Sequence, residues 1–168
     1  MLRKMLVASS LVATVNAQAA QWWGFTEVMS DHVMTYFDAE SLTHQGQSVN
    51  VWVNFIYNNA FRKADGPARL MQKYRYNCKA HTAQVLQSTF YSPTGEITGS
   101  SNAPYDPDDV IPGSIGESMY KAACTPGFPV VNKLTKPLLQ PIAHNDPDRE
   151  AQEMFKYLAA KAASAAGH

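Results

Sequence analysis

SVNVWVNFIYN, the stretch from Ser48 to Asn58, decides the fold class of this chain of 168 residues. Its side chains alternate in character, and one face would carry Val49, Val51, Val53, Phe55 and Tyr57. The opposite face would carry Asn50, Trp52, Asn54 and Ile56. Alternation with a period of two, in β-branched and aromatic residues, predicts a β-strand that turns one face toward a core.

Similar segments lie on both sides of this strand in the sequence. Further strands are expected at residues 21–30, 33–38, 69–78, 83–91 and 96–100. Residues 38–42 are expected as a short helical turn between two of them. Consecutive strands joined by short turns form antiparallel sheets. The expected fold class is therefore α+β, with a single antiparallel sheet of about five to six strands, a packed helix after the sheet and an extra C-terminal helix.

The two helices are predicted from their start signals. Ser114 followed by Glu117 is a capping box, which predicts a helix from Ile115 to about Ala123. Asp146 before Pro147 predicts the start of a last helix over residues 146–168. The apolar face of that helix would carry Ala151, Met154, Phe155, Leu158 and Ala162. Residues 125–145 contain four prolines and are expected as a linker.

Residues 1–20 have the three parts of a secretory signal peptide. Arg3 and Lys4 form a positive start, residues 5–15 are apolar, and Ala17-Gln18-Ala19 is a small-residue cleavage motif. The apolar stretch is shorter than the about 20 residues that a membrane-spanning helix needs, although a buried N-terminal helix is the alternative interpretation. We expect an exported protein, periplasmic or secreted, with no transmembrane segment. Any association with the cell surface would lack a lipid anchor, because no cysteine lies near the cleavage point.

The chain has two cysteines, Cys78 and Cys124. In an oxidising compartment an even pair indicates one disulfide, here between the end of a strand and the end of the first helix. A redox motif would need C-x-x-C, which is absent. Cys78 with His81 supplies only half of a zinc site, so we expect neither a metal nor another cofactor.

The sequence shows no reaction motif, and we expect no enzyme. The five histidines fall in turns, linkers or the terminus, and the acidic group Asp106, Asp108 and Asp109 lacks the spacing of a calcium loop. Basic and acidic residues balance at 14 each, which argues against nucleic acid as a partner. One basic segment carries Arg69, Lys73 and Arg75. It could contact an acidic partner, or it could be a solvated strand that protects a sheet edge.

Several ordered segments carry a resemblance to a known family. They are Gln21-Trp22-Trp23, Tyr36-Phe37-Asp38 with Ser41, Val49 to Val53, Tyr76-Asn77-Cys78, Ser88 to Tyr91 with Gly95, and Ile111 to Glu117 ending at Cys124. Over about residues 21–124 the chain resembles the bacterial surface-adhesin protein E-like domain. The stretch that begins at Ile111 is the most specific part of this resemblance.

The resemblance implies an antiparallel sheet with a packed helix, a Cys78–Cys124 disulfide and no known catalytic activity. The founding member is an outer-membrane adhesin that binds host matrix proteins and plasminogen and can dimerise. We therefore expect a non-enzymatic binding protein that contacts host or envelope proteins or glycans, with a homodimer as one further expectation. The alternative is a structural periplasmic protein that associates through its C-terminal helix. This chain departs from the founding adhesin because it has no lipid-attachment cysteine and extends beyond Cys124.

Overall fold

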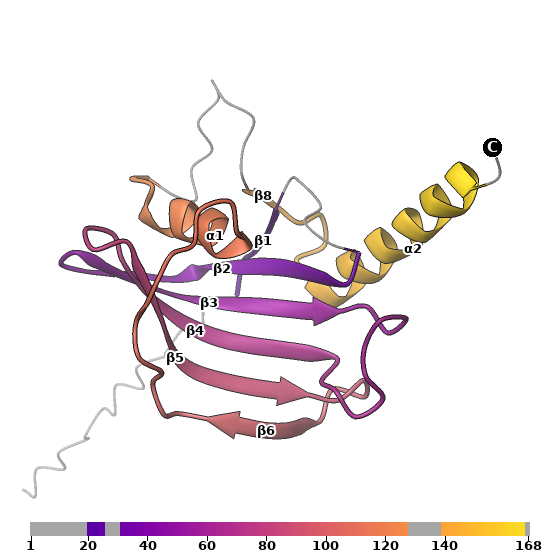
Figure 1. Cartoon of the computed structure of the whole chain (residues 1–168), viewed down its shortest axis with the longest axis horizontal. Coiled ribbons are helices and arrows are strands. Elements are labelled where there is room, and N and C mark those ends of the chain that lie inside the picture. Colours follow the sequence, from indigo (N-terminus) through magenta and orange to yellow (C-terminus); the bar gives the residue numbers. More distant parts are fainter. Residues whose placement is uncertain (1–19, 26–30, 128–138, 167–168) are drawn as a thin grey trace, which may run out of the picture.

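The structure, a computed structural model, describes residues 20–25, 31–127 and 139–166. Residues 1–19, which make up nearly all of the expected signal peptide, lie outside the described ranges. Within these ranges the chain forms one antiparallel sheet of eight strands and two helices (Figure 1). The α+β class with a single antiparallel sheet is confirmed, and the number of strands is higher than expected.

The strands follow the sequence closely in space. Their order across the sheet is β6-β5-β4-β3-β2-β1-β8, and the short strand β7 pairs with β5. The strands are β1 (Trp22–Phe25), β2 (Val33–Gln45), β3 (Ser48–Tyr57), β4 (Arg69–Asn77), β5 (Thr82–Tyr91), β6 (Ile97–Ser101), β7 (Asp108–Asp109) and β8 (Leu139–Pro141). The helices are α1 (Ile115–Cys124) and α2 (Pro147–Ala166). No helix in the described ranges is long and apolar enough to cross a membrane.

The helical turn expected at residues 38–42 is wrong, because β2 continues through this segment. The register with β3 shifts between Asp38 and Thr43, and Ser41 occupies the irregularity. Its hydroxyl donates to the Asp38 carbonyl at 2.7 Å and accepts from the backbone N–H of Trp52 at 2.8 Å. The side chain thus takes over pairing that the bulged backbone cannot make. The same polar residues resemble a helix start when they are read from sequence alone.

Part of the segment expected as a linker belongs to the sheet. Strand β8 pairs with β1, with Leu139 opposite Phe25 and Pro141 opposite Trp23. Leu139 is buried in the core. Proline is tolerated at this position because β8 is the last strand of the described sheet order, and an edge strand needs fewer backbone donors.

The two helices cover opposite faces of the sheet. Alternation along β3 sends Val51 and Val53 to the face that α1 covers, where Met119 and Ala123 pack against them. The other face carries a second apolar cluster, formed by Met34, Tyr36, Ile56, Ala151 and Phe155. The first half of α2 therefore packs on the part of this face that β2 and β3 form, and its second half extends past the sheet (Figure 1).

Candidate functional site

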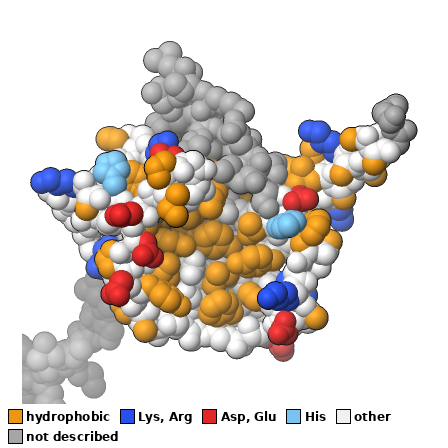
Figure 2. Space-filling model, in the orientation of Figure 1, with side chains coloured by type: hydrophobic (Ala, Val, Ile, Leu, Met, Phe, Trp, Pro, Cys, Tyr) orange, Lys and Arg blue, Asp and Glu red, His pale blue; other side chains and the backbone are white. Residues whose placement is uncertain are grey.

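Helix α1 leaves much of its own sheet face uncovered. We call the uncovered part the open sheet face. It comprises Phe55, Tyr57, Leu70, Tyr74, Val85 and Phe90, all of them only partly buried. Figure 2 shows hydrophobic side chains gathered over the middle strands of the sheet. A contiguous apolar surface of this kind marks an interaction site more often than an isolated exposed side chain does.

Strand register brings these side chains together from three neighbouring strands. Phe55 of β3 lies opposite Leu70 of β4, and Leu70 lies opposite Phe90 of β5. Tyr74 of β4 lies opposite Val85 of β5 in the same way. The face is therefore built on paired backbone rather than on loops, and such a framework holds a binding surface in one shape.

Aromatic contacts and a short hydrogen-bond chain fix the centre of the open sheet face. The Tyr74 ring stacks on Tyr76, with centroids 5.5 Å apart and planes within 6°. The Tyr74 hydroxyl donates to Gln72 Oε1 at 2.8 Å, and Gln72 Nε2 donates to Ser88 Oγ at 3.0 Å. Burial, with a smaller contribution from Tyr57, raises the pKa of Tyr74 to about 12. The ring is therefore neutral at physiological pH and presents an apolar face with its polar group satisfied.

One edge of the open sheet face is deepened into a pocket of about 360 Å³. Tyr74 and Val85 lie on its sheet side, and Tyr105, Asp106 and Asp108 come from the segment after β6. This segment is held in place because the Tyr105 N–H donates to the Val85 carbonyl at 3.0 Å, and because β7 pairs with β5. Two of the three acidic residues that the sequence singled out, Asp106 and Asp108, therefore lie at the rim of an apolar surface. No group of His, Cys, Asp and Glu side chains in the described ranges could hold a metal ion.

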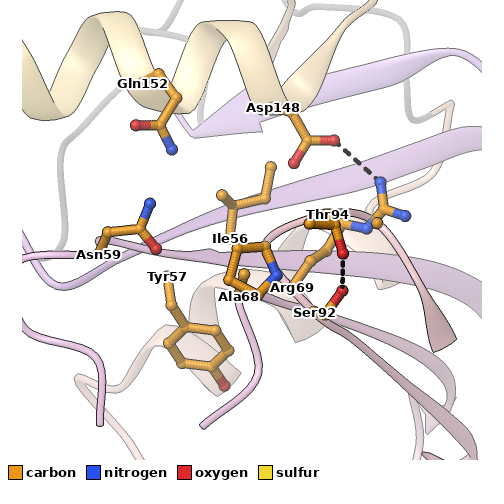
Figure 3. A pocket seen from close by; sticks show the side chains of 11 residues that line it. Ile56, Tyr57, Asn59, Ala68, Arg69, Ser92, Thr94, Asp148 and Gln152 are labelled. Carbon is orange, nitrogen blue, oxygen red and sulfur yellow. Dashed lines mark hydrogen bonds and ion pairs between the residues drawn. The ribbon is translucent and has the colours of Figure 1, made fainter. Parts of the chain in front are cut away.

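The predicted basic residues Arg69, Lys73 and Arg75 all lie on the opposite face of β4. Arg69 donates to Asp148 of α2 at 3.0 Å (Figure 3). Its guanidinium also stacks 4.0 Å above the Tyr91 ring. Its charge is thus used to dock α2 on the sheet. Lys73 lies 5.9 Å from the centroid of the Trp52 ring, and Arg75 donates to Asn50 at 3.3 Å. The structure does not bring the three cations together as one free stripe.

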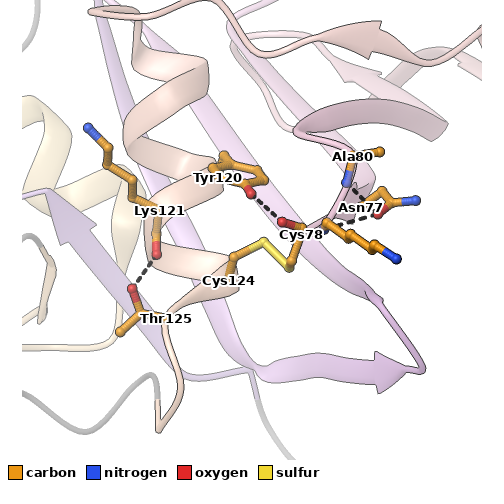
Figure 4. Close-up of a disulfide and its surroundings, with 8 residues drawn as sticks. Asn77, Cys78, Ala80, Tyr120, Lys121, Cys124 and Thr125 are labelled. Atoms are coloured by element: carbon orange, nitrogen blue, oxygen red, sulfur yellow. Dashed lines mark hydrogen bonds between the residues drawn. A yellow bond between two sulfur atoms is a disulfide. The ribbon is translucent and has the colours of Figure 1, made fainter.

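The predicted disulfide joins Cys78 to Cys124, as Figure 4 shows. It ties the last residue of α1 to the chain directly after β4. The Tyr120 hydroxyl donates to the Cys78 carbonyl at 2.7 Å and adds a second connection at the same place. Together the two bonds fix how far α1 reaches over the sheet, and therefore where the open sheet face begins.

The predicted capping residues lie at the other end of α1. Ser114 Oγ accepts from the Glu117 N–H at 3.1 Å, and Glu117 reaches back to the N–H of Gly113 at 2.8 Å. The hydrogen bond from Lys121, followed by that from Gly113, lowers the pKa of Glu117 below its ordinary value. These residues position the helix and do not form part of the open sheet face.

The sequence did not single out the open sheet face, although it contained a usable signal. The pattern on residues 69–78 and 83–91 predicted strands, but it did not say which of their side chains a helix would cover. A helix is about 10 Å wide and rises 1.5 Å per residue, whereas strands lie about 4.8 Å apart. The ten residues of α1 cannot cover five strands of this length. A comparison of helix length with sheet area would have predicted an uncovered surface.

The chain matches the family described as Surface-adhesin protein E over residues 22–125. This match spans more than half of the chain, which therefore belongs to the surface-adhesin protein E family. The resemblance inferred from the sequence is confirmed. No curated protein and no solved structure matches the chain.

Proposed function

We propose that this chain is an exported, non-enzymatic binding protein whose open sheet face contacts a protein partner. The observation that supports this most directly is the partly exposed apolar surface on β3, β4 and β5 in a member of a surface-adhesin family. Partly exposed aromatic side chains on a rigid framework can bury a large apolar area against a partner at little cost in conformational entropy. The signal-like residues 1–20 and the disulfide support the export part of the proposal.

Strand β4 offers a matched test, since neighbouring residues on it point to opposite faces. Leu70→Asp places a charge in the open sheet face, whereas Lys73→Glu reverses a charge on the other face. The probes are immobilised extracellular-matrix proteins and plasminogen, and binding is measured by surface plasmon resonance. We expect Leu70→Asp to weaken binding at least tenfold and Lys73→Glu to leave it within about twofold. Phe90→Gln on β5 changes the open sheet face at a second position, so the result does not depend on the folding of one variant. Thermal melting of all three variants shows whether each is folded.

Loss of binding through the basic face of β4 would contradict the proposal. If the paired reversal of Lys73 and Arg75 abolishes binding while Leu70→Asp does not, the basic face of β4 is the contact surface and the proposal is wrong. Arg69 is left unchanged in this test because it binds Asp148 and holds α2 in place. Equal binding by all variants would also contradict the proposal, because neither face of the sheet would then be the contact surface.

A second candidate function is a structural envelope protein that associates through α2. One observation favours it: the second half of this helix extends past the sheet, and Tyr157 is 60% exposed. Phe155, by contrast, is buried in the chain's own core and is not available to a partner. Sedimentation of a Tyr157→Ser variant tests this candidate, because an unchanged monomer–oligomer distribution would exclude the exposed part of α2 as the interface.

A further inference from the structure

The seam between α2 and the sheet contains a second pocket, of about 410 Å³, on the face opposite α1. Residues from four separate parts of the chain line it: the end of β3, the start of β4, the turn between β5 and β6, and the first turns of α2. We call it the seam pocket. Its volume is within the range of small-molecule sites in proteins. Because α2 lies beyond residue 125, this pocket is not a feature of the matched family domain alone.

The walls of the seam pocket carry side chains that can both donate and accept hydrogen bonds. Figure 3 shows Gln152 and Asp148 reaching from α2 toward the sheet, with the Asn59 amide beneath Gln152. The turn adds the hydroxyls of Ser92 and Thr94, which lie 2.8 Å from each other. Amide and hydroxyl groups can pair with a ligand group that is donor and acceptor at once.

The charges in the seam pocket cancel, because Arg69 Nη1 lies 3.0 Å from Asp148 Oδ2. An anionic ligand would meet the Asp148 carboxylate, and a cationic ligand would meet the Arg69 guanidinium. Arg69 is also held in place from below, since it stacks on Tyr91. The pair therefore presents fixed donors and acceptors of hydrogen bonds without a net charge, which favours a neutral polar ligand.

The floor of the seam pocket is apolar. Ile56, which is 2% exposed, lies beneath it, and Ala68 and Pro93 contribute further carbon surface. A ring with hydroxyl groups around its edge and C–H groups on its faces matches an apolar floor with polar walls. From this combination we infer that the seam pocket binds a neutral sugar, either free or as the end of a longer glycan. The inference does not rest on the open sheet face, which lies on the other side of the sheet.

The test is a titration of the full-length chain followed by ¹H–¹⁵N NMR. The probes are the methyl pyranosides of glucose, galactose, mannose and N-acetylglucosamine, with sodium phosphate and lysine methyl ester as charged controls. We expect saturable shifts of the Asn59, Thr94 and Gln152 signals with at least one sugar and none with the charged probes. Saturable shifts with phosphate alone, or none with any sugar at 100 mM, would overturn the inference.

Two pairs of variants make the assignment specific. Gln152→Ala and Asn59→Ala are expected to weaken sugar binding about tenfold, because an unpaired polar group in the complex costs free energy. Gln140→Ala and Asn102→Ala, both exposed and outside the pocket, are the matched controls and should bind as the unchanged chain does. Weakening in both pairs alike would contradict a site in the seam pocket. Tighter binding of an oligosaccharide than of its terminal sugar would identify a glycan rather than a free sugar as the ligand.

Discussion

Tyr76 lies fully buried between the sheet and α1, and its ring links two aromatic neighbours. It stacks on Tyr74 on one side and meets Tyr120 edge-on at 6.3 Å on the other. Burial, then the proximity of Tyr74, raises the pKa of Tyr76 well above its ordinary value. The pKa of Tyr36 on the other face is also raised, mainly by burial and then by Glu150 and Asp148. Both clusters of the core thus contain phenols that must stay protonated.

These phenols predict a loss of stability at alkaline pH. An unfolded tyrosine loses its proton near pH 10, whereas Tyr74 keeps it until about 12. The unfolded state therefore binds fewer protons between these values, so the stability from the neutral phenol is complete below pH 10 and is lost as the pH rises toward 12. Urea unfolding at pH 8, 10 and 11 should show a falling midpoint, with a shallower fall in Tyr74→Phe. A midpoint independent of pH over this range would contradict the burial of these rings.

At the scale of elements, the cap of α1 makes a specific prediction. Ser114→Ala removes the acceptor of the Glu117 N–H and should lower the free energy of unfolding by about 1 kcal/mol. Ser118→Ala on the same helix is the control, because no hydrogen bond of its side chain is found among the described residues. Urea denaturation of both variants measures the difference. Equal stability of the two variants would show that the capping hydrogen bond contributes nothing in solution.

Phe155 is the largest of the buried side chains through which α2 packs on the sheet. Phe155 is 5% exposed and packs with Met34, Tyr36 and Ile56. Phe155→Ala should lower the free energy of unfolding by about 3 kcal/mol, because it leaves a cavity and removes apolar contact. Tyr157→Ala, which is 60% exposed on the same helix, should change it by less than about 0.5 kcal/mol. Guanidinium denaturation measures the stability of both variants. Similar midpoints for Phe155→Ala and Tyr157→Ala would mean that α2 is not docked on the sheet in solution.

The elements also show what the sequence could and could not predict. Strand β3 was predictable because its residues alternate between two environments, and α1 because Ser114 and Glu117 mark its start. Strand β8 was not predictable, because it pairs with β1, which lies far away in the sequence. In its local sequence, Pro141 indicates a linker rather than a strand. The extension of β2 was missed because Ser41 satisfies a bulge through its side chain. Local patterns carry no information on such long-range pairing.

The two candidate surfaces also depend on contacts that are distant in the sequence. Arg69, Lys73 and Arg75 were noticed as a charge pattern, but the partner that neutralises Arg69 lies 79 residues away on α2. The open sheet face depends on how little of the sheet α1 covers, which only the assembled molecule shows. Both surfaces follow from where the two helices dock.

The disulfide sets the position of α1 for the whole molecule, and its removal is the broadest test of the fold. Cys78 and Cys124 are 46 residues apart, for which loss of chain entropy in the unfolded state predicts a stabilisation of about 4 kcal/mol. Reduction should therefore lower the urea midpoint substantially, yet leave the β2–β5 ladder and the α2 cluster in place, because neither contains a cysteine. Denaturation with and without dithiothreitol, with the Cys78→Ala/Cys124→Ala double variant as a control, measures this. Equal midpoints would mean that α1 is held by packing alone. A large difference would mean that the chain reaches full stability only where the bond can form, as expected of a protein that acts outside the cytoplasm.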